Sequence, residues 1–370
     1  NGSGSITINN PINTAGITSV TLGTSNFVAG VNAGNSITSG GNYNTTIGDE
    51  AGTAITTGDN NVAVGYNSLT ANTTGTDSVA IGHSALLAQT TGGDNVAIGH
   101  LAMSSLTTAG NNTAVGDRAM QANTSGENNV AIGTLALDAN TTGASNTAVG
   151  RDSLTANTTG TQNTAVGKSA LAANTTAGQN TAMGREALFA NTTGADNTAI
   201  GAAALYSNTT ASSNTAVGRS CLINNTTGAE NVAVGAESLD ANTTGVQNNA
   251  IGYLSLTSCT TGSYNVAMGV AALNDTTTGE SNVALGHLSS YSNLTGSSNT
   301  AVGQKSFYTN TTGTSNVVVG KSAMYYNTTG AGNTAVGVNA LTANTTASNN
   351  TAVGTDALKA NTTGSLNVAV

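Results

Sequence analysis

The sequence predicts an all-β fold, a β-solenoid or β-roll fibre in which each turn is one 17-residue repeat. Three observations carry this prediction. The phrase Asn44-Thr45-Thr46-Ile47-Gly48 returns with substitutions every 17 residues up to Asn367, without an insertion or a deletion. The phrase alternates with period two and is rich in β-branched residues, which favours a short strand over a helix. Charged residues make up only 7% of the 370 residues, whereas ordinary globular domains contain about 25%.

The overall composition argues against several other classes of protein. With 38% apolar residues and a net charge of −9, the chain is too apolar for a disordered polypeptide. Its 8 Lys and Arg stand against 17 Asp and Glu, so the clustered cations that nucleic-acid binding needs are missing. No run of about 18 apolar residues is present, so we expect no membrane span.

The chain divides into a lead-in segment and an array. Residues 1–43 carry no charge and contain two short β-like runs, Ile6–Ile8 and Val20–Leu22, so we expect an N-terminal β cap or lead-in there. Residues 44–370 form the array, with 19 complete units and a truncated last one. Because repeat arrays normally end in a cap, we expect the polypeptide to continue beyond Val370.

The repeat pattern predicts which side chains point inward. With the Asn as position one, position four is always aliphatic, position five is Gly in every complete unit, and position nine is Leu or Met in nearly all units. We therefore expect positions four and nine to face the core. Ala at position three and Gly at position five would face the other way, where small residues allow another backbone to approach. Every charged residue falls at position six, seven, ten, eleven, sixteen or seventeen, so these positions should meet water.

The second conspicuous phrase is Asn-Thr-Thr-Gly, as in Asn72–Gly75. It indicates a turn or second short strand, with Asn side chains that repeat one above another and hydrogen-bond along the stack. The phrase also matches the N-glycosylation sequon. Because turns stacked about 4.8 Å apart would bring neighbouring glycans into collision, we favour the structural ladder.

Few residues offer chemistry. His83, His100 and His287 all fall at position six, and we interpret them as exposed corner residues because no further metal ligand recurs near them. Cys221 and Cys259 lie too many turns apart for an intrachain disulfide, and two cysteines do not make a zinc site. No nucleophile is paired with a His and a carboxylate, so we expect neither catalysis nor a cofactor.

Aromatic residues form the one irregularity that could bind a partner. They recur at position ten of successive units. Stacked, exposed rings of this kind can bind a sugar or a protein surface through their faces and hydroxyls. Ordinary cross-strand packing that stiffens the edge of the fibre is the explanation we favour. The candidate binding stripe consists of Phe189, Tyr206, Tyr291, Tyr308 and Tyr325.

Two stretches, Asp77-Ser-Val-Ala-Ile-Gly-His-Ser-Ala85 and Asp94-Asn-Val-Ala-Ile-Gly-His-Leu-Ala102, resemble the head repeat of YadA-type trimeric autotransporter adhesins. The whole array, with Asn-Thr-Ala-Val-Gly and Ala-Leu joined by Asn-Thr-Thr-Gly, is more similar to repeat shafts of phage tail fibres that end in a self-cleaving chaperone domain. The resemblance covers about residues 44–370 and implies a homotrimeric fibre on a virion or outside a cell. The adhesin head repeat is shorter than 17 residues, so the detailed coil differs.

The size of the core also favours association. Each unit supplies about two large aliphatic side chains, and burying each one stabilises the fold by roughly 1.5–3 kcal/mol. Ordering the chain costs about 1.5 kcal/mol of conformational entropy for each of the 17 residues, so the core of a single chain is thin and association of several chains would add buried area. We therefore expect a structural fibre shaft that presents or performs adhesion to a cell surface. The alternatives are an adhesin head that binds host matrix, glycans or a protein receptor, and an ice-binding solenoid that uses its Thr rows.

Overall fold

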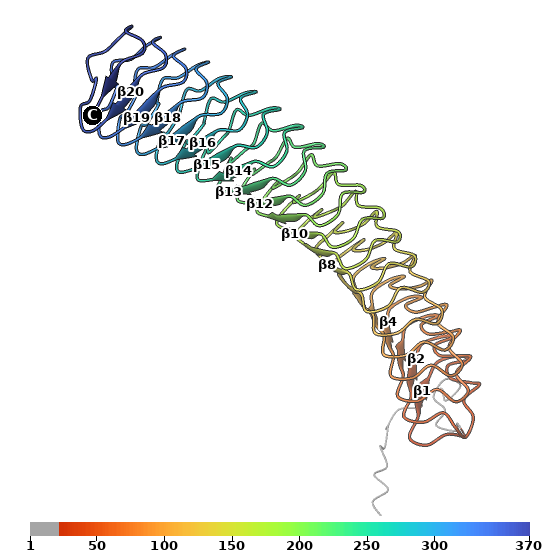
Figure 1. Cartoon of the computed structure of the whole chain (residues 1–370). Helices are drawn as coiled ribbons and strands as arrows, with labels where there is room; N and C mark the ends of the chain where they lie inside the picture. Colours follow the sequence, from red (N-terminus) through yellow and green to blue (C-terminus); the bar gives the residue numbers. More distant parts are fainter. Residues whose placement is uncertain (1–21) are drawn as a thin grey trace, which may run out of the picture. The chain divides into compact units, whose positions relative to one another are not determined.

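The computed structural model describes residues 22–370, which form a parallel β-solenoid with one three-residue strand in nearly every 17-residue turn. Of the two β-like runs expected near the N-terminus, Ile6–Ile8 lies outside the described residues, as do the first two residues of Val20–Leu22. The chain divides into two compact units, residues 1–159 and 160–370. Figure 1 shows the strands of each unit lying side by side, one from each turn.

The described part of the first unit, residues 22–159, contains eight strands, each paired in parallel with the next. The step from the first strand to the second is 18 residues, because Phe27 pairs with Thr45, and every later step is 17. Within the described residues, the coil therefore includes one turn before Asn44. The strands are β1 (Phe27–Ala29), β2 (Thr45–Ile47), β3 (Val62–Val64), β4 (Val79–Ile81), β5 (Val96–Ile98), β6 (Thr113–Val115), β7 (Val130–Ile132) and β8 (Thr147–Val149).

The second unit repeats this arrangement with thirteen strands. Val166, Met183 and Ile200 are register partners in three successive strands, as the 17-residue period predicts. The strands are β9 (Thr164–Val166), β10 (Thr181–Met183), β11 (Thr198–Ile200), β12 (Thr215–Val217), β13 (Val232–Val234), β14 (Asn249–Ile251), β15 (Val266–Met268), β16 (Val283–Leu285), β17 (Thr300–Val302), β18 (Val317–Val319), β19 (Thr334–Val336), β20 (Thr351–Val353) and β21 (Val368–Ala369).

The direction predicted for the strand side chains was wrong. In nearly every strand the middle residue is buried, and the residues on either side are partly or largely exposed to solvent. Position three therefore faces the core, and positions two and four face outward. In β11, for example, Ala199 is fully buried, whereas Ile200 is 38% exposed. The two small residues of the phrase therefore do not mark the approach of a second chain.

The physical reason is the small volume inside one turn. The Leu of position nine, for example Leu205, is fully buried, and the residue at position three of the same turn is Ala in nearly every turn. The turn that begins at Asn44 demonstrates this limit. There position three is the larger Thr46 and position nine is Gly52, where an added Cβ would lie 2.7 Å from Thr46 Cγ2 and 2.9 Å from Ile55 Cδ1. In this turn the larger Thr46 is matched by a smaller residue at position nine, whereas the turn that begins at Asn316 buries both Val318 and Met324.

Two ladders of buried asparagines complete the interior, which confirms the predicted Asn ladder and adds a second. At position twelve, Asn208 Nδ2 donates to Asn191 Oδ1 of the preceding turn at 2.8 Å and to the carbonyl of Ala211 at 2.9 Å. At position one, the backbone N–H of Asn231 donates to Asn214 Oδ1 at 2.9 Å. Both ladders satisfy polar groups that the coil removes from water.

One turn departs from the position-one ladder and compensates within the chain. It begins with Ser78 instead of Asn, and its position twelve is Gln89. The longer Gln89 side chain donates to Ser78 Oγ at 3.0 Å and accepts from Asn95 Nδ2 at 3.0 Å. The buried polar network is thus kept closed when one member is shortened.

Candidate functional sites

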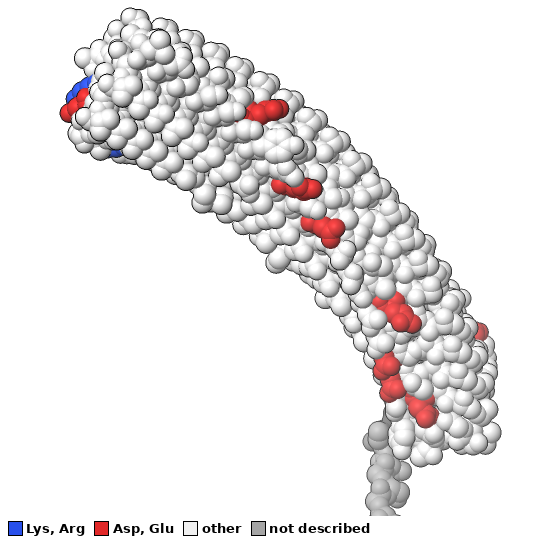
Figure 2. Space-filling model, viewed as in Figure 1, with Lys and Arg blue, Asp and Glu red and all other residues white. Residues whose placement is uncertain are grey.

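The most extensive candidate surface is the outward face of the strands, which we call the strand face and define as positions two and four of every turn. At position four of the second unit, Met183, Ile251 and Met268 are 42%, 37% and 44% exposed. Within residues 22–370, no strand residue is charged. Figure 2 shows one side of the molecule, on which acidic side chains form isolated patches on a mainly uncharged surface. The sequence did not reveal this surface. Positions two and four never carry a charge, and such positions can be either buried in the core or exposed on an apolar face.

Three of the predicted aromatic residues form one stack. The rings of Tyr291 and Tyr308 are 5.4 Å apart and those of Tyr308 and Tyr325 are 4.9 Å apart, with interplanar angles of 15°. Tyr326 packs its ring edgewise on Tyr325 at 4.7 Å. We call Tyr291, Tyr308, Tyr325 and Tyr326 the tyrosine stack. Because the central ring is covered on both faces by its neighbours, its edge and hydroxyl are the parts left for a ligand.

Charged groups flank the tyrosine stack. Lys305 Nζ lies 6.0 Å from the centroid of the Tyr308 ring, at the outer limit of a cation–π contact. On the preceding turn, the charge of Asp275 raises the pKa of Tyr291, and burial raises the pKa of Asp275 itself. The stack therefore has an acidic end and a basic flank.

The other two predicted aromatic residues form a separate pair. Phe189 and Tyr206 stack at 5.0 Å with an interplanar angle of 7°. Both rings are half-buried. The predicted stripe is therefore two separate stacks rather than one continuous surface.

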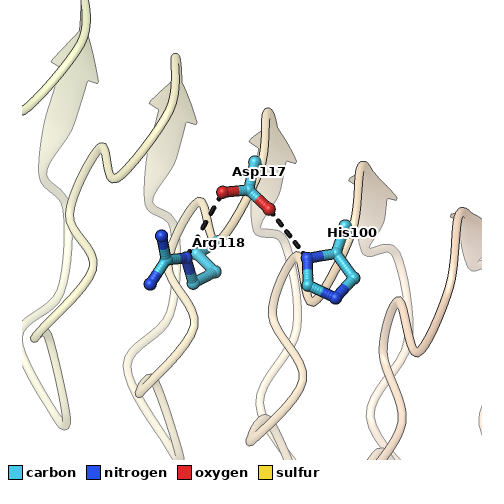
Figure 3. Close-up of polar contacts among 3 residues, drawn as sticks. All are labelled: His100, Asp117 and Arg118. Carbon is cyan, nitrogen blue, oxygen red and sulfur yellow. Dashed lines mark hydrogen bonds and ion pairs between the residues drawn. The ribbon is translucent and has the colours of Figure 1, made fainter.

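The first two histidines lie together on a corner of the first unit. The ring centroids of His83 and His100 are 5.2 Å apart, and Tyr66 lies 5.4 Å from His83 on the other side. His100 Nδ1 lies 2.8 Å from Asp117 Oδ1, and Asp117 Oδ2 lies 3.3 Å from Arg118 Nε, as Figure 3 shows. The hydrogen bond from His100, followed by that from Arg118, holds the pKa of Asp117 below its usual range. We call this group the histidine corner.

Asp117 occupies position six of the turn that follows His100, so the 17-residue spacing was the signal that could have found this contact. His287, by contrast, has Val270 and Gln304 at the same position of the turns before and after it. It is an exposed residue outside any such group, as predicted.

The cysteines and the sequons offer no reactive group at the surface. Cys221 and Cys259 are buried free thiols, and burial raises the pKa of each to about 12. The Asn of a typical sequon, Asn208, is fully buried with its amide nitrogen engaged in the ladder. Glycosylation there would require the turn to open.

The Thr rows differ in availability. The hydroxyl of Thr192 at position thirteen donates to the carbonyl of Thr209 in the next turn at 3.0 Å, and most turns repeat this bond. Thr193 at position fourteen is exposed. Ice binding through these rows stays a prediction.

Within residues 22–370, no group of three or more His, Cys, Asp or Glu side chains is arranged to hold a metal ion. The same part of the chain contains no helix with the length and apolarity needed to cross a bilayer. No protein-family model matches the chain, and no curated protein matches its sequence.

Proposed function

We propose that this protein is the structural shaft of an extracellular or virion fibre, in which copies of the chain associate through the strand face as a homotrimer. The strand face is the observation that carries the proposal. A monomer in water would keep a row of partly exposed aliphatic and Met side chains at position four, beside an uncharged row of mainly Val and Thr at position two. Contiguous apolar surface of this kind marks interaction sites. The resemblance to phage tail-fibre shafts and YadA-type adhesins favours three chains.

The strand face is continuous along the second unit. Position four is aliphatic or Met in every turn, and position two is Val or Thr in every turn except the one with Asn249. Stacked over successive turns, these side chains form one uncharged strip, which gives a copy of the chain a long surface to cover.

Three aspartates on the strand face test this proposal. We expect the wild-type chain to sediment as a trimer and the triple variant Ile200→Asp, Val217→Asp, Val234→Asp to sediment as a monomer, because three carboxylates would be desolvated in the interface. Analytical ultracentrifugation measures the result, and circular dichroism reports whether the coil is retained.

A matched variant carries the same charges in the same three turns, at position eleven. It is Ser207→Asp, Asn224→Asp, Ala241→Asp, and Asp275 occupies this position naturally in another turn. We expect this control to remain a trimer. A monomeric wild type, or an unchanged mass for the strand-face variant, would contradict the proposal.

The tyrosine stack favours a second candidate function, an adhesive surface for glycans on the same fibre. Its row of hydroxyls about 5 Å apart can donate to and accept from sugar hydroxyls, and its outer ring faces can pack against a sugar ring. The flanking Lys305 adds a cation. This role is compatible with a shaft, since an adhesive patch needs only a few turns.

Removal of the stack tests the adhesive role. We expect the triple variant Tyr291→Ser, Tyr308→Ser, Tyr325→Ser to lose at least about tenfold in affinity on a glycan array or for target cells, since aromatic contacts contribute about 0.5–1.5 kcal/mol each. The variant Tyr253→Ser, Tyr264→Ser removes two tyrosines that are 51% and 55% exposed outside the stack. Equal binding by the wild type and the stack variant would show that the rings only stiffen the coil.

A further inference from the structure

We propose that His83 and His100 form a binding site for a divalent transition-metal ion of the Cu²⁺, Ni²⁺ or Zn²⁺ class on the corner of the first unit. This inference does not depend on the proposed fibre function. It rests on the geometry of the two rings, on the contact between His100 and Asp117, and on exposure of the site.

The spacing of the two imidazoles fits a shared ion. Two histidines that ligate one tetrahedral ion, with metal–nitrogen distances of about 2.0–2.1 Å, place their ring centroids roughly 5 Å apart. The centroids of His83 and His100 are 5.2 Å apart. The strands that precede them, β4 and β5, are hydrogen-bonded in register, so the backbone places the two histidines side by side on successive turns.

The contact between His100 and Asp117 orients the His100 ring and leaves one ring nitrogen free to bind the ion. The Asp117 carboxylate can only accept, so Nδ1 of His100 carries the proton and Nε2 of the neutral ring is left as the ligating atom. Metal-binding histidines commonly donate their other N–H to a carboxylate in this way, which fixes the tautomer and raises the basicity of the ligand. Arg118 holds the second oxygen of Asp117 and so orients the carboxylate (Figure 3).

The environment decides the class of ion. His100 is 52% exposed at its side chain and His83 is also exposed, so water can fill the remaining coordination positions. Two imidazole nitrogens suit Cu²⁺, Ni²⁺ and Zn²⁺, with Cu²⁺ bound most tightly in this series, whereas Ca²⁺ and Mg²⁺ prefer oxygen ligands. We infer a site that supplies two protein ligands and shares the ion with solvent.

Copper titration of the full-length, untagged chain tests the inference. We expect one Cu²⁺ per chain by isothermal titration calorimetry at neutral pH, and a frozen-solution electron paramagnetic resonance spectrum with nitrogen coupling from imidazole. We expect His83→Ala and His100→Ala each to lower the affinity more than about 100-fold. We expect Asp117→Asn to lower it by roughly 10–100-fold, the usual cost of losing the partner that orients a ligating histidine.

The chain contains its own control. His287→Ala removes a histidine at the same position of a turn that has no second histidine beside it, and we expect its affinity for Cu²⁺ to equal that of the wild type. Misfolding is no obstacle to the His83 and His100 variants, because position six is also occupied by Thr134 and Ala202 in other turns. Equal copper affinity in the wild type and the double variant His83→Ala, His100→Ala would overturn the proposal, as would a spectrum without nitrogen coupling.

Discussion

Replacing Gly201 with alanine is expected to unfold the turns around β11 and β12. Gly201 has φ +134°, a conformation that L-residues rarely adopt, and an added Cβ would lie 2.5 Å from the carbonyl oxygen of Gly218 in the next turn. The obstacle is backbone held in the parallel ladder, so it cannot move aside as a side chain would. Backbone strain of about 1–3 kcal/mol and a steric cost of similar size give an expected loss of roughly 2–6 kcal/mol.

Chemical denaturation followed by circular dichroism measures the loss, and hydrogen exchange locates it. Because each turn contacts mainly its neighbours, amide protection should fall near residues 184–235 and persist in distant turns of the second unit. The control is Gly332→Asn. Gly332 has φ +64°, and Asn349 occupies the same position of the next turn with φ +59°. An added Cβ at Gly332 would lie 2.7 Å from Asn349 Oδ1, but this atom is the end of a side chain that can move aside. We expect this variant to stay within about 0.5 kcal/mol of the wild type. Equal stability of the Gly201 variant would mean that the stacked backbones are not as close as described.

Replacing Asn214 with alanine is the second change expected to be severe. Asn214 is fully buried; its Oδ1 accepts the backbone N–H of Asn231 at 2.9 Å, and its Nδ2 donates to the carbonyl of Gly228 at 3.0 Å. The carbonyl of Gly228 keeps a second donor, Asn225 Nδ2, but the N–H of Asn231 is left without a partner. An unsatisfied buried donor costs about 1–3 kcal/mol, and the lost packing adds to it.

We therefore expect the free energy of unfolding to fall by roughly 2–4 kcal/mol in Asn214→Ala, measured by urea denaturation. Asn224→Ala is the matched change in the same turn. Asn224 is exposed and its Nδ2 donates to the carbonyl of Asp240 at 3.0 Å, where water can replace it. We expect a loss below about 0.5 kcal/mol for this control. A similar loss in both variants would show that burial of the ladder adds nothing to its strength.

The fold was largely predictable because the repeat has no insertions. A fixed 17-residue period places equivalent residues one above another, and it correctly put Val166, Met183 and Ile200 in one column. The charged positions correctly marked the outer corners. The Asn ladder of position twelve was also predictable, since buried side chains with both a donor and an acceptor pair along a stack.

The candidate sites were predictable only in part. The aromatic residues were identified by their spacing, but the covered faces of Tyr308 depend on how the rings turn. The contact between His100 and Asp117 needed both the period and a carboxylate at the right position of the next turn. The strand face was missed because its direction was predicted wrongly.

The sequence by itself determined that this protein is a stack of 17-residue turns with charged corners and polar ladders, because period and charge leave few other arrangements. Only the tertiary structure decided which side of each strand faces the core. In a strand such as Thr198-Ala199-Ile200, either the middle residue or its two neighbours can face the core. The choice depends on how much space is left inside the turn. Leu205 itself has φ +53°, a conformation uncommon for leucine, and its side chain is fully buried inside the turn. The small Ala199 therefore turns inward, and the aliphatic row faces outward.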